Sequence, residues 1–172
     1  KAMHKKLRDL NWKPPAGWKG ITTYEMHTGG EPLRILTGGF PRIKGGSILE
    51  KRRYFRDHFD HLRRGLMWEP RGHADMYGCI ITEPEREDSD FGVIFTHNEG
   101  YSSMCGHGII AVTKVAIETG MIKYVTPVTT IRIDAPAGQI ISNAKIKDGK
   151  VESVYFQNVP SFLCLKDAEV EV

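Results

Sequence analysis

The segment Cys105–Gly120 has the sequence CGHGIIAVTKVAIETG and predicts a helix from about Gly106 to Thr119, closed by Gly120. Isoleucine, valine and alanine occupy nearly every position around this helix, so its apolar surface is not limited to one stripe. A helix with so little polar surface has to be enclosed by other elements. The sequence therefore favours an α+β fold, in which mixed β-structure is wrapped around a central apolar helix.

β-Strands are predicted on both sides of this helix, where β-branched and aromatic residues recur between turn residues. The expected strands are Ile21–Met26, Leu33–Thr37, Tyr77–Thr82, Phe91–Thr96, Thr130–Ala135, Gln139–Lys147 and Lys150–Gln157. Asp148-Gly149, between the last two, is a strong signal for a two-residue hairpin turn. With another helix after the second strand, the order is β-β-α-β-β-α-β-β-β, which is typical of a mixed α+β domain.

This other helix is amphipathic and is predicted to begin after Ser47, because Ser47 and Glu50 have the spacing of a capping box. Its apolar stripe, at helical intervals, consists of Phe55, Phe59, Leu62 and Leu66. Arg63 and Arg64 suit the negative end of a helix dipole, and Gly65 is expected to terminate the helix there.

A basic group lies on the same helix and consists of Lys51, Arg52, Arg53 and Arg56. Acidic residues are interleaved with it, namely Glu50, Asp57 and Asp60. This mixture of charges favours a solvated helix surface over a phosphate-binding face.

The whole chain has the size and composition of an ordinary globular domain. It contains 172 residues, of which 40% are hydrophobic and 26% charged, and this excludes collagen-like, fibrous and fully disordered classes. Residues 1–20 are polar and rich in lysine, tryptophan and proline, so we expect an N-terminal arm there. Residues 21–172 are expected to form one domain with its own core.

Charge and hydropathy argue against several kinds of partner. The net charge of +3 is too small to indicate nucleic acid, and no apolar run approaches the roughly 20 residues that span a bilayer. No apolar segment follows the basic start of the chain, so no secretory signal is expected. Three cysteines are too few, and odd in number, for a disulfide framework. We therefore expect a cytoplasmic protein that binds neither nucleic acid nor membranes.

The polar turn His97–Met104 leads into Cys105 at the predicted start of the apolar helix. Helix N-termini expose unpaired N–H groups and carry partial positive charge, so they favour a thiolate over a thiol. The pKa of Cys105 is therefore expected to fall below the free value of about 8.5. The same N–H groups can bind a substrate carboxylate, and Gly106 and Gly108 leave the backbone open to it.

Other interpretations of these residues stay open. Cys105 could be a small buried hydrophobic residue, and His107 could be a core histidine, a substrate ligand or a general acid. A zinc site made by Cys105 and His107, with His97 or Cys79, is a further alternative, although no recognised zinc spacing is present. Cys79 and Cys164 lie in apolar segments and are predicted to be structural.

Five blocks of sequence stand in order along the chain. They are Met26–Arg34 (MHTGGEPLR), Lys51–Tyr54 (KRRY), Leu66–His73 (LMWEPRGH), Asp75–Gly78 (DMYG) and Met104–His107 (MCGH). Together they resemble the proline racemase family, which includes proline racemases, hydroxyproline epimerases and trans-3-hydroxy-L-proline dehydratases. The resemblance runs from about Tyr24 to Phe162. It implies a diaminopimelate-epimerase-like fold, in which two lobes each wrap β-structure around a central helix and enclose the substrate between them.

The resemblance also implies chemistry without a cofactor or a metal. Cys105 would be the first base, while Gly106 and His107 would contact a proline or hydroxyproline through a backbone N–H and an imidazole. Family members are roughly twice as long, so residues 21–172 would form the N-terminal lobe of a two-lobe protein. A second lobe of the same protein, with a second catalytic residue, is therefore an expected partner. The isolated chain is expected to have negligible turnover, and an exposed cleft face would allow a homodimer.

The segment His97–Ser103 resembles the dehydratase members, so the expected activity is that of a trans-3-hydroxy-L-proline dehydratase. Proline racemase or hydroxyproline 2-epimerase activity is the alternative, because the residue that separates the subtypes lies in the other lobe. A non-catalytic imino-acid-binding domain, which needs only the helix N-terminus and Gly106, is an alternative of another class. A zinc protein is a third possibility.

Several charged residues lie beside glycine and proline turns, namely Glu31, Arg34, Arg71, His73 and Asp75. Such residues could line the cleft or satisfy exposed backbone groups. Since buried polar groups need partners, we expect them to brace the loops.

Overall fold

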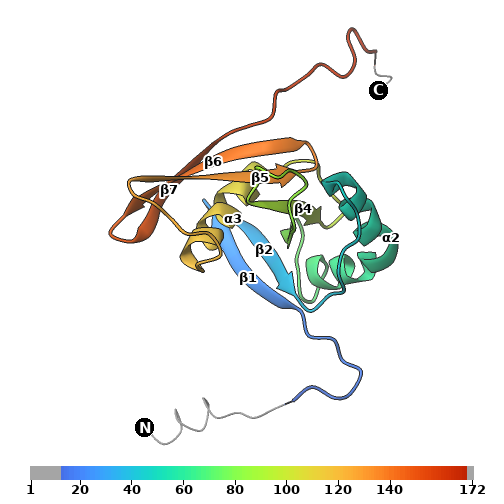
Figure 1. The fold of residues 1–172 in the computed structure, drawn as a ribbon. Helices are drawn as coiled ribbons and strands as arrows, with labels where there is room; N and C mark the ends of the chain where they lie inside the picture. Colours follow the sequence, from blue (N-terminus) through green and yellow to red (C-terminus); the bar gives the residue numbers. More distant parts are fainter. Residues whose placement is uncertain (1–12, 170–172) are drawn as a thin grey trace, which may run out of the picture.

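The computed structural model describes residues 13–169, and this part of the chain contains one seven-stranded sheet and two helices (Figure 1). The strands are β1 (Thr22–Thr28), β2 (Glu31–Gly38), β3 (Tyr77–Thr82), β4 (Phe91–His97), β5 (Val128–Ala135), β6 (Gly138–Lys147) and β7 (Lys150–Gln157). The helices are α2 (Ile48–Met67) and α3 (Gly106–Glu118). The predicted order of elements and the α+β class are both confirmed.

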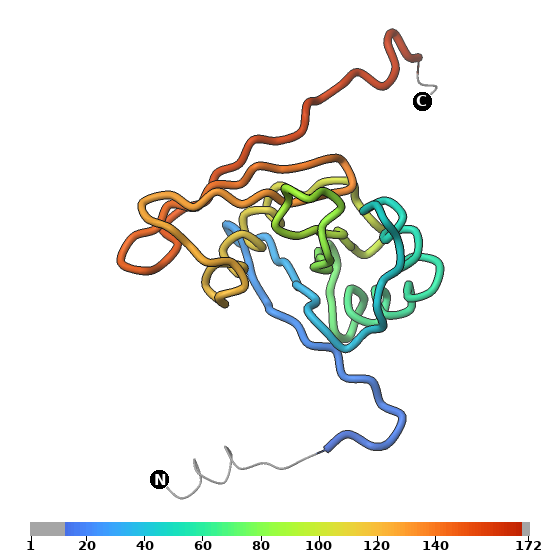
Figure 2. Tube along the Cα trace, viewed as in Figure 1, coloured from blue at the N-terminus to red at the C-terminus, as the bar shows by residue number. Residues whose placement is uncertain are grey.

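The sheet is mixed, and its strands lie side by side in chain order from β1 to β7. Neighbouring strands are antiparallel except at β2–β3 and β4–β5, which are parallel. Two neighbouring parallel strands need a crossover connection, which α2 and α3 supply. Figure 2 shows this path as the chain leaves the sheet for each helix and returns to it.

The sheet curls around α3, which contacts β1, β2, β6 and β7. Figure 1 shows α3 between the β1–β2 hairpin and the long strands β5 to β7. Ile109, Val112 and Ala116 on this helix are fully buried. The predicted wrapping of β-structure around a central apolar helix is therefore confirmed.

The central strands are covered on both faces. Ile35, Cys79 and Phe95 belong to the core around α3. The alternate residues Leu36, Ile80 and Ile94 pack with Ile48 and Phe55 of α2. Because β4 has a helix over each face, its sequence is a continuous buried run rather than an alternating one.

α2 begins as predicted and ends later than predicted. Ser47 Oγ accepts from the N–H of Glu50 at 3.1 Å, and the Glu50 carboxylate accepts from the N–H of Ser47 at 3.2 Å, which completes the capping box. Termination at Gly65 is wrong, because the helix continues to Met67 and ends with Trp68 as its cap. The side chain of Met67 is fully buried, so core packing holds the last turn together past the glycine.

The ends of the described chain carry no helix or strand. Residues 13–20 are exposed, and residues 1–12 of the predicted arm lie outside the described residues. Beyond β7 the apolar segment around Cys164 is exposed, with Phe162 at 86%. The structural role predicted for Cys164 is therefore wrong, since nothing within residues 13–169 packs over it. Neither α2 nor α3 is both long and apolar enough for a bilayer crossing.

Candidate active site

Cys105 is the N-cap residue of α3, at the point where the turn after β4 enters the buried helix. Its side chain makes no capping bond to the helix and is 6% exposed. The backbone N–H of Gly108 lies near the sulfur and acts to lower the pKa of the thiol, without forming a capping hydrogen bond. A Cβ on Gly108 would lie 3.0 Å from Cys105 Sγ and 2.9 Å from Phe95 Cε1, so only glycine leaves room for this contact.

His107 lies against the same sulfur. Its Nδ1 is 3.4 Å from Cys105 Sγ, and its Nε2 is 3.2 Å from the carbonyl oxygen of Pro32. A carbonyl only accepts hydrogen bonds, so the Pro32 contact favours the tautomer with the hydrogen on Nε2. The sulfur lies beside the ring, 3.4 Å from Nδ1 and 3.7 Å from Nε2, and is not aligned with the lone pair of Nδ1. The edge of Tyr77 packs on the imidazole at a centroid distance of 5.2 Å, and the Thr28 hydroxyl donates to the backbone carbonyl of His107 at 3.0 Å.

The pKa of Cys105 differs from the sequence-based expectation. Burial raises the pKa of this thiol to about 11, although the Gly108 N–H acts against the rise. The negative charge of Glu31 adds to it. The predicted lowering below the free value is therefore wrong for this chain, because the loss of hydration around the sulfur outweighs the helix N-terminus.

Gly106, the first residue of α3, lies beside Phe156 of β7. A Cβ at Gly106 would lie 3.4 Å from Phe156 Cζ, so this side of the helix start is closely covered. The structure thus brings Cys105, Gly106 and His107 together on one turn.

The other candidate ligands lie apart from this turn or are enclosed. His97 stacks on Tyr77 at a centroid distance of 5.4 Å, and its Nδ1 accepts from the N–H of Glu99. Cys79 is fully buried in β3 and burial raises its pKa, as a structural role predicts. Among residues 13–169, no group of three or more histidine, cysteine or acidic side chains is arranged to hold a metal ion.

The loop before Cys105 is held by Arg63, whose role the sequence reasoning missed. This side chain is 6% exposed, and its Nη1 donates to the carbonyls of His97 at 2.8 Å and Asn98 at 2.6 Å. Its Nε donates to Asp60 at 2.6 Å, and Asp60 also accepts from the Tyr101 hydroxyl at 2.9 Å. In the sequence, the i, i+3 spacing of Asp60 and Arg63 is the feature that indicates this ion pair.

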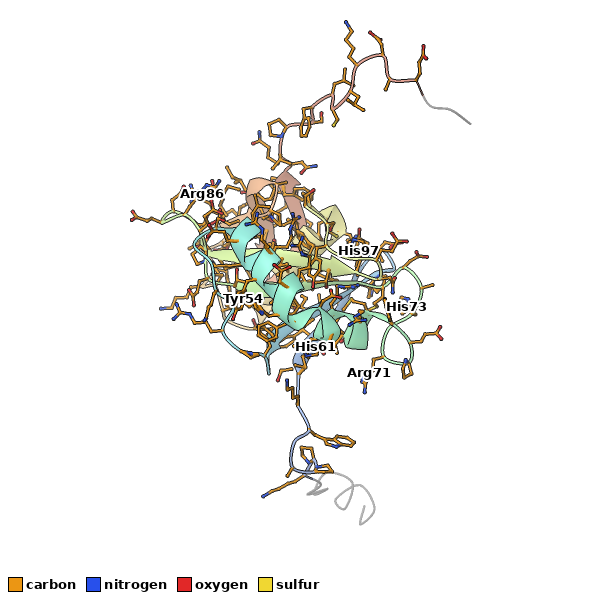
Figure 3. All side chains as sticks on the ribbon, turned by 90° about the vertical axis from the view of Figure 1, so that its right-hand side faces the viewer. Tyr54, His61, Arg71, His73, Arg86 and His97 are labelled. Carbon is orange, nitrogen blue, oxygen red and sulfur yellow. The ribbon has the colours of Figure 1, made fainter. Side chains whose placement is uncertain are left out.

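A second set of bonds holds the same loop from the end of α2. Asn98 Nδ2 donates to the carbonyls of Met67 at 2.7 Å and His73 at 2.9 Å, and Trp68 Nε1 donates to the Asn98 carbonyl at 2.8 Å. In Figure 3, which faces α2, His97 and His73 lie on the same side of the helix. Arg34 donates to the Arg71 carbonyl at 2.8 Å, which supports the bracing role predicted for it.

Ser102 is a further feature that the sequence reasoning missed. Its hydroxyl is buried and has no hydrogen-bond partner within the described part of the chain. A buried hydroxyl without a partner is rare in a folded protein. It lies three residues before Cys105, on the loop that leads into the site.

The chain is similar in sequence to known proteins. A sequence model of the family described as "Proline racemase" matches residues 23–172. A trans-3-hydroxy-L-proline dehydratase of Colwellia psychrerythraea is 54% identical over 164 residues, covering 94% of this chain and 46% of that protein. A proline racemase of Acetoanaerobium sticklandii is 49% identical over 154 residues, covering 90% of the chain and 46% of the relative. The chain thus spans about half the length of the curated relatives it matches.

Solved structures match the fold as well. A hydroxyproline epimerase from Agrobacterium vitis, with bound trans-4-hydroxy-L-proline, superposes with a TM-score of 0.80 at 26% identity. The match covers 87% of this chain and 44% of that one. A probable proline racemase from Agrobacterium radiobacter, with bound carbonate, gives a TM-score of 0.81 at 27% identity over 88% of this chain and 45% of that one. The resemblance seen in the sequence is confirmed by these matches.

Proposed function

The chain belongs to the proline racemase family, and on that basis we propose that, in the whole protein, Cys105 removes the α-proton of a proline or hydroxyproline without a cofactor or a metal. Relatives at 54–57% identity are named trans-3-hydroxy-L-proline dehydratase, which favours dehydration of that substrate. A proline racemase and a 3-hydroxyproline 2-epimerase at 49% and 48% identity make racemisation or epimerisation the alternative.

The contact between Cys105 and His107 is the observation that carries this proposal. The thiol, with a pKa of about 11, keeps its proton at neutral pH. His107 Nδ1 lies 3.4 Å from Sγ, and in this proposal the imidazole turns towards the sulfur to accept that proton when the substrate binds. Transfer of the proton from sulfur to Nδ1 leaves a thiolate, which then takes the α-hydrogen of the substrate as a proton.

The electron pair of the broken C–H bond moves towards the substrate carboxylate. The N-terminus of α3 offers backbone N–H groups for that carboxylate, which accords with the predicted contact through Gly106. Such groups are oriented before the reaction and stabilise the developing charge. In dehydration the pair then forms the double bond between the α- and β-carbons, and the 3-hydroxyl group leaves as water after accepting a proton.

The group that protonates the leaving hydroxyl, or that acts on the opposite face of the ring, belongs to the remainder of the protein in this proposal. We assign residues 1–20 to an arm and residues 21–172 to the first of two lobes, so the isolated chain has negligible turnover. The free cysteines Cys79, Cys105 and Cys164 accord with the cytoplasmic location proposed for the protein.

The test is an assay of the full-length protein with trans-3-hydroxy-L-proline, L-proline and trans-4-hydroxy-L-proline. Loss of water from the first substrate, followed by mass spectrometry, supports the dehydratase, whereas inversion of either of the others supports the alternative. Turnover should be lost in Cys105→Ser and retained in Cys164→Ser, whose cysteine is exposed. Full activity of Cys105→Ser would refute the assignment of the base.

The same protein variants distinguish the enzyme from a non-catalytic imino-acid-binding domain. Binding without turnover for all three substrates, with equal affinity in Cys105→Ser and the unaltered protein, would favour that domain. It would need only the N-terminus of α3.

A further inference from the structure

α2 carries a pocket that the proposed reaction does not use. The pocket has a volume of about 470 Å³ and is lined by Leu49, Arg52, Arg53, Arg56, Gly100 and Tyr101. Three arginines therefore line one concave space between α2 and the turn after β4, and none of the lining residues is acidic. We propose that this pocket binds a small dianion of the phosphate type.

The acidic residues that are interleaved with these arginines in the sequence do not neutralise the pocket. Glu50 accepts from the backbone N–H groups of its own capping box. Asp60 is held by the buried Arg63 at 2.6 Å. Only Asp57 pairs with a lining residue, at 2.9 Å from Arg56. Two of the three acids thus cap α2 and brace the loop, while Arg53 and Arg56 are exposed, as the prediction of a solvated helix surface requires.

Lys51 precedes these arginines in the sequence, but its side chain is buried and does not line the pocket. It is 5% exposed, and its Nζ donates to the carbonyl of Glu83 at 2.6 Å. The basic group is thus divided, with Lys51 serving the fold and the three arginines gathered at the pocket.

The positive charges of Arg52 and Arg53 have no bonded partner in the described part of the chain. Within residues 13–169, neither side chain forms a hydrogen bond or an ion pair, although Arg53 interacts electrostatically with Glu50. Arg52 and Arg56 stand at i, i+4, where like charges repel and weaken a helix. A bound dianion would remove this repulsion and give both free side chains a partner.

The shape of the pocket favours a small ligand over a macromolecule. Its volume falls within the range of about 300–1,000 Å³ that is typical of small-molecule sites. Tyr101 is fixed there by its bond to Asp60 and by edge packing on Phe55 at a centroid distance of 6.4 Å. Gly100 has open space where a Cβ would stand. Planar guanidinium groups bind phosphate oxygens through paired hydrogen bonds, which a single ammonium group cannot do.

The test is calorimetric titration of the full-length protein with inorganic phosphate, with ionic strength held constant by sodium chloride. Saturable binding is expected in the unaltered protein. It should weaken by about tenfold or more in the double variant Arg52→Gln/Arg53→Gln, which removes two charge-assisted partners. Arg64→Gln is the matched control, because Arg64 is an exposed arginine of the same helix outside the pocket.

Absence of saturable binding would overturn the proposal, and so would undiminished binding in the double variant, which would place the phosphate elsewhere, such as the N-terminus of α3. If the glutamine variant does not fold, Arg52→Lys/Arg53→Lys replaces it. That variant keeps the charge and loses the paired hydrogen bonds, so its affinity should fall severalfold. An unchanged affinity for phosphate would then contradict recognition by the guanidinium groups.

Discussion

His107 Nδ1 lies 3.4 Å from Cys105 Sγ on the first turn of α3, while Nε2 of the same ring is tied to the carbonyl of Pro32. This second bond favours the tautomer with the hydrogen on Nε2, which leaves Nδ1, the ring nitrogen nearer to the sulfur, able to accept a proton. Since burial raises the pKa of Cys105 to about 11, the thiol needs a neighbouring base at neutral pH. In the proposed reaction, the imidazole of His107 serves as that base.

The first prediction concerns this imidazole. In the full-length protein, His107→Gln should lower kcat/KM at neutral pH by about 100-fold or more, because a positioned base is lost. The remaining activity should rise towards alkaline pH, since the thiol must then ionise with its own pKa of about 11. His61→Gln, which alters an exposed histidine of α2, should behave as the unaltered protein. An unchanged pH profile in His107→Gln would contradict the role of the ring.

The second prediction concerns the space at Gly108. A methyl group there would lie 2.9 Å from Phe95 Cε1 and 3.0 Å from Cys105 Sγ, so Gly108→Ala should lower the free energy of unfolding by about 1–3 kcal/mol. Gly65→Ala meets open space inside α2 and should raise this free energy by about 0.5–1 kcal/mol. Urea unfolding of the full-length protein measures both changes. A gain in stability from Gly108→Ala would show that the turn is loosely packed.

The third prediction compares two adjacent arginines. Arg63→Met leaves Asp60 and two loop carbonyls without their buried partner, so it should cost about 3–5 kcal/mol of unfolding free energy. Arg64→Met alters a half-exposed side chain 3.3 Å from the same Asp60 and should change stability by no more than about 0.5 kcal/mol. The difference is measured by urea unfolding. Equal effects of the two substitutions would mean that Arg63 does not hold the loop.

The fourth prediction concerns acid stability and Asp134, which is fully buried in β5. Burial by itself would raise its pKa, but hydrogen bonds from Arg86, Glu85 and Ser89 outweigh it and hold the pKa below its ordinary value. A depressed pKa gives stability that is complete above the unfolded pKa of about 3.9 and is lost as the pH falls through the folded value.

Unfolding free energy should therefore fall as the pH drops below about 4, and Asp134→Asn should be less stable at neutral pH with a shallower fall. Asp167→Asn, in the exposed C-terminal segment, should follow the unaltered protein. Parallel curves for Asp134→Asn and the unaltered protein would rule out this carboxylate as the source of the acid dependence.

Features set by neighbouring residues in the chain could be predicted from the sequence. The apolar surface of α3 requires enclosure, and the Ser47 and Glu50 spacing produced the capping box that the structure contains. Tyr77–Thr82 and Lys150–Gln157 were predicted with their observed bounds, because turn residues flank both strands.

Features set by contacts between distant segments could not be predicted in this way. In the sequence, Arg63 and Lys51 resemble charged surface residues. In the structure, each side chain is buried and donates to a backbone carbonyl at least 30 residues away in the chain. The direction of the Cys105 pKa shift depends on how closely the loop and sheet cover the sulfur, which no local pattern encodes. Gly65 failed as a helix end because Met67 is buried by the sheet.

Exchange of the substrate α-hydrogen in deuterium oxide, followed by proton NMR, tests the central role of Cys105 most directly. The full-length protein, incubated with trans-3-hydroxy-L-proline or L-proline, should remove the α-proton signal, and Cys164→Ser should do the same. Cys105→Ser should leave that signal intact over the same time while keeping its native circular dichroism. Loss of the α-proton signal at an unchanged rate in Cys105→Ser would contradict the account.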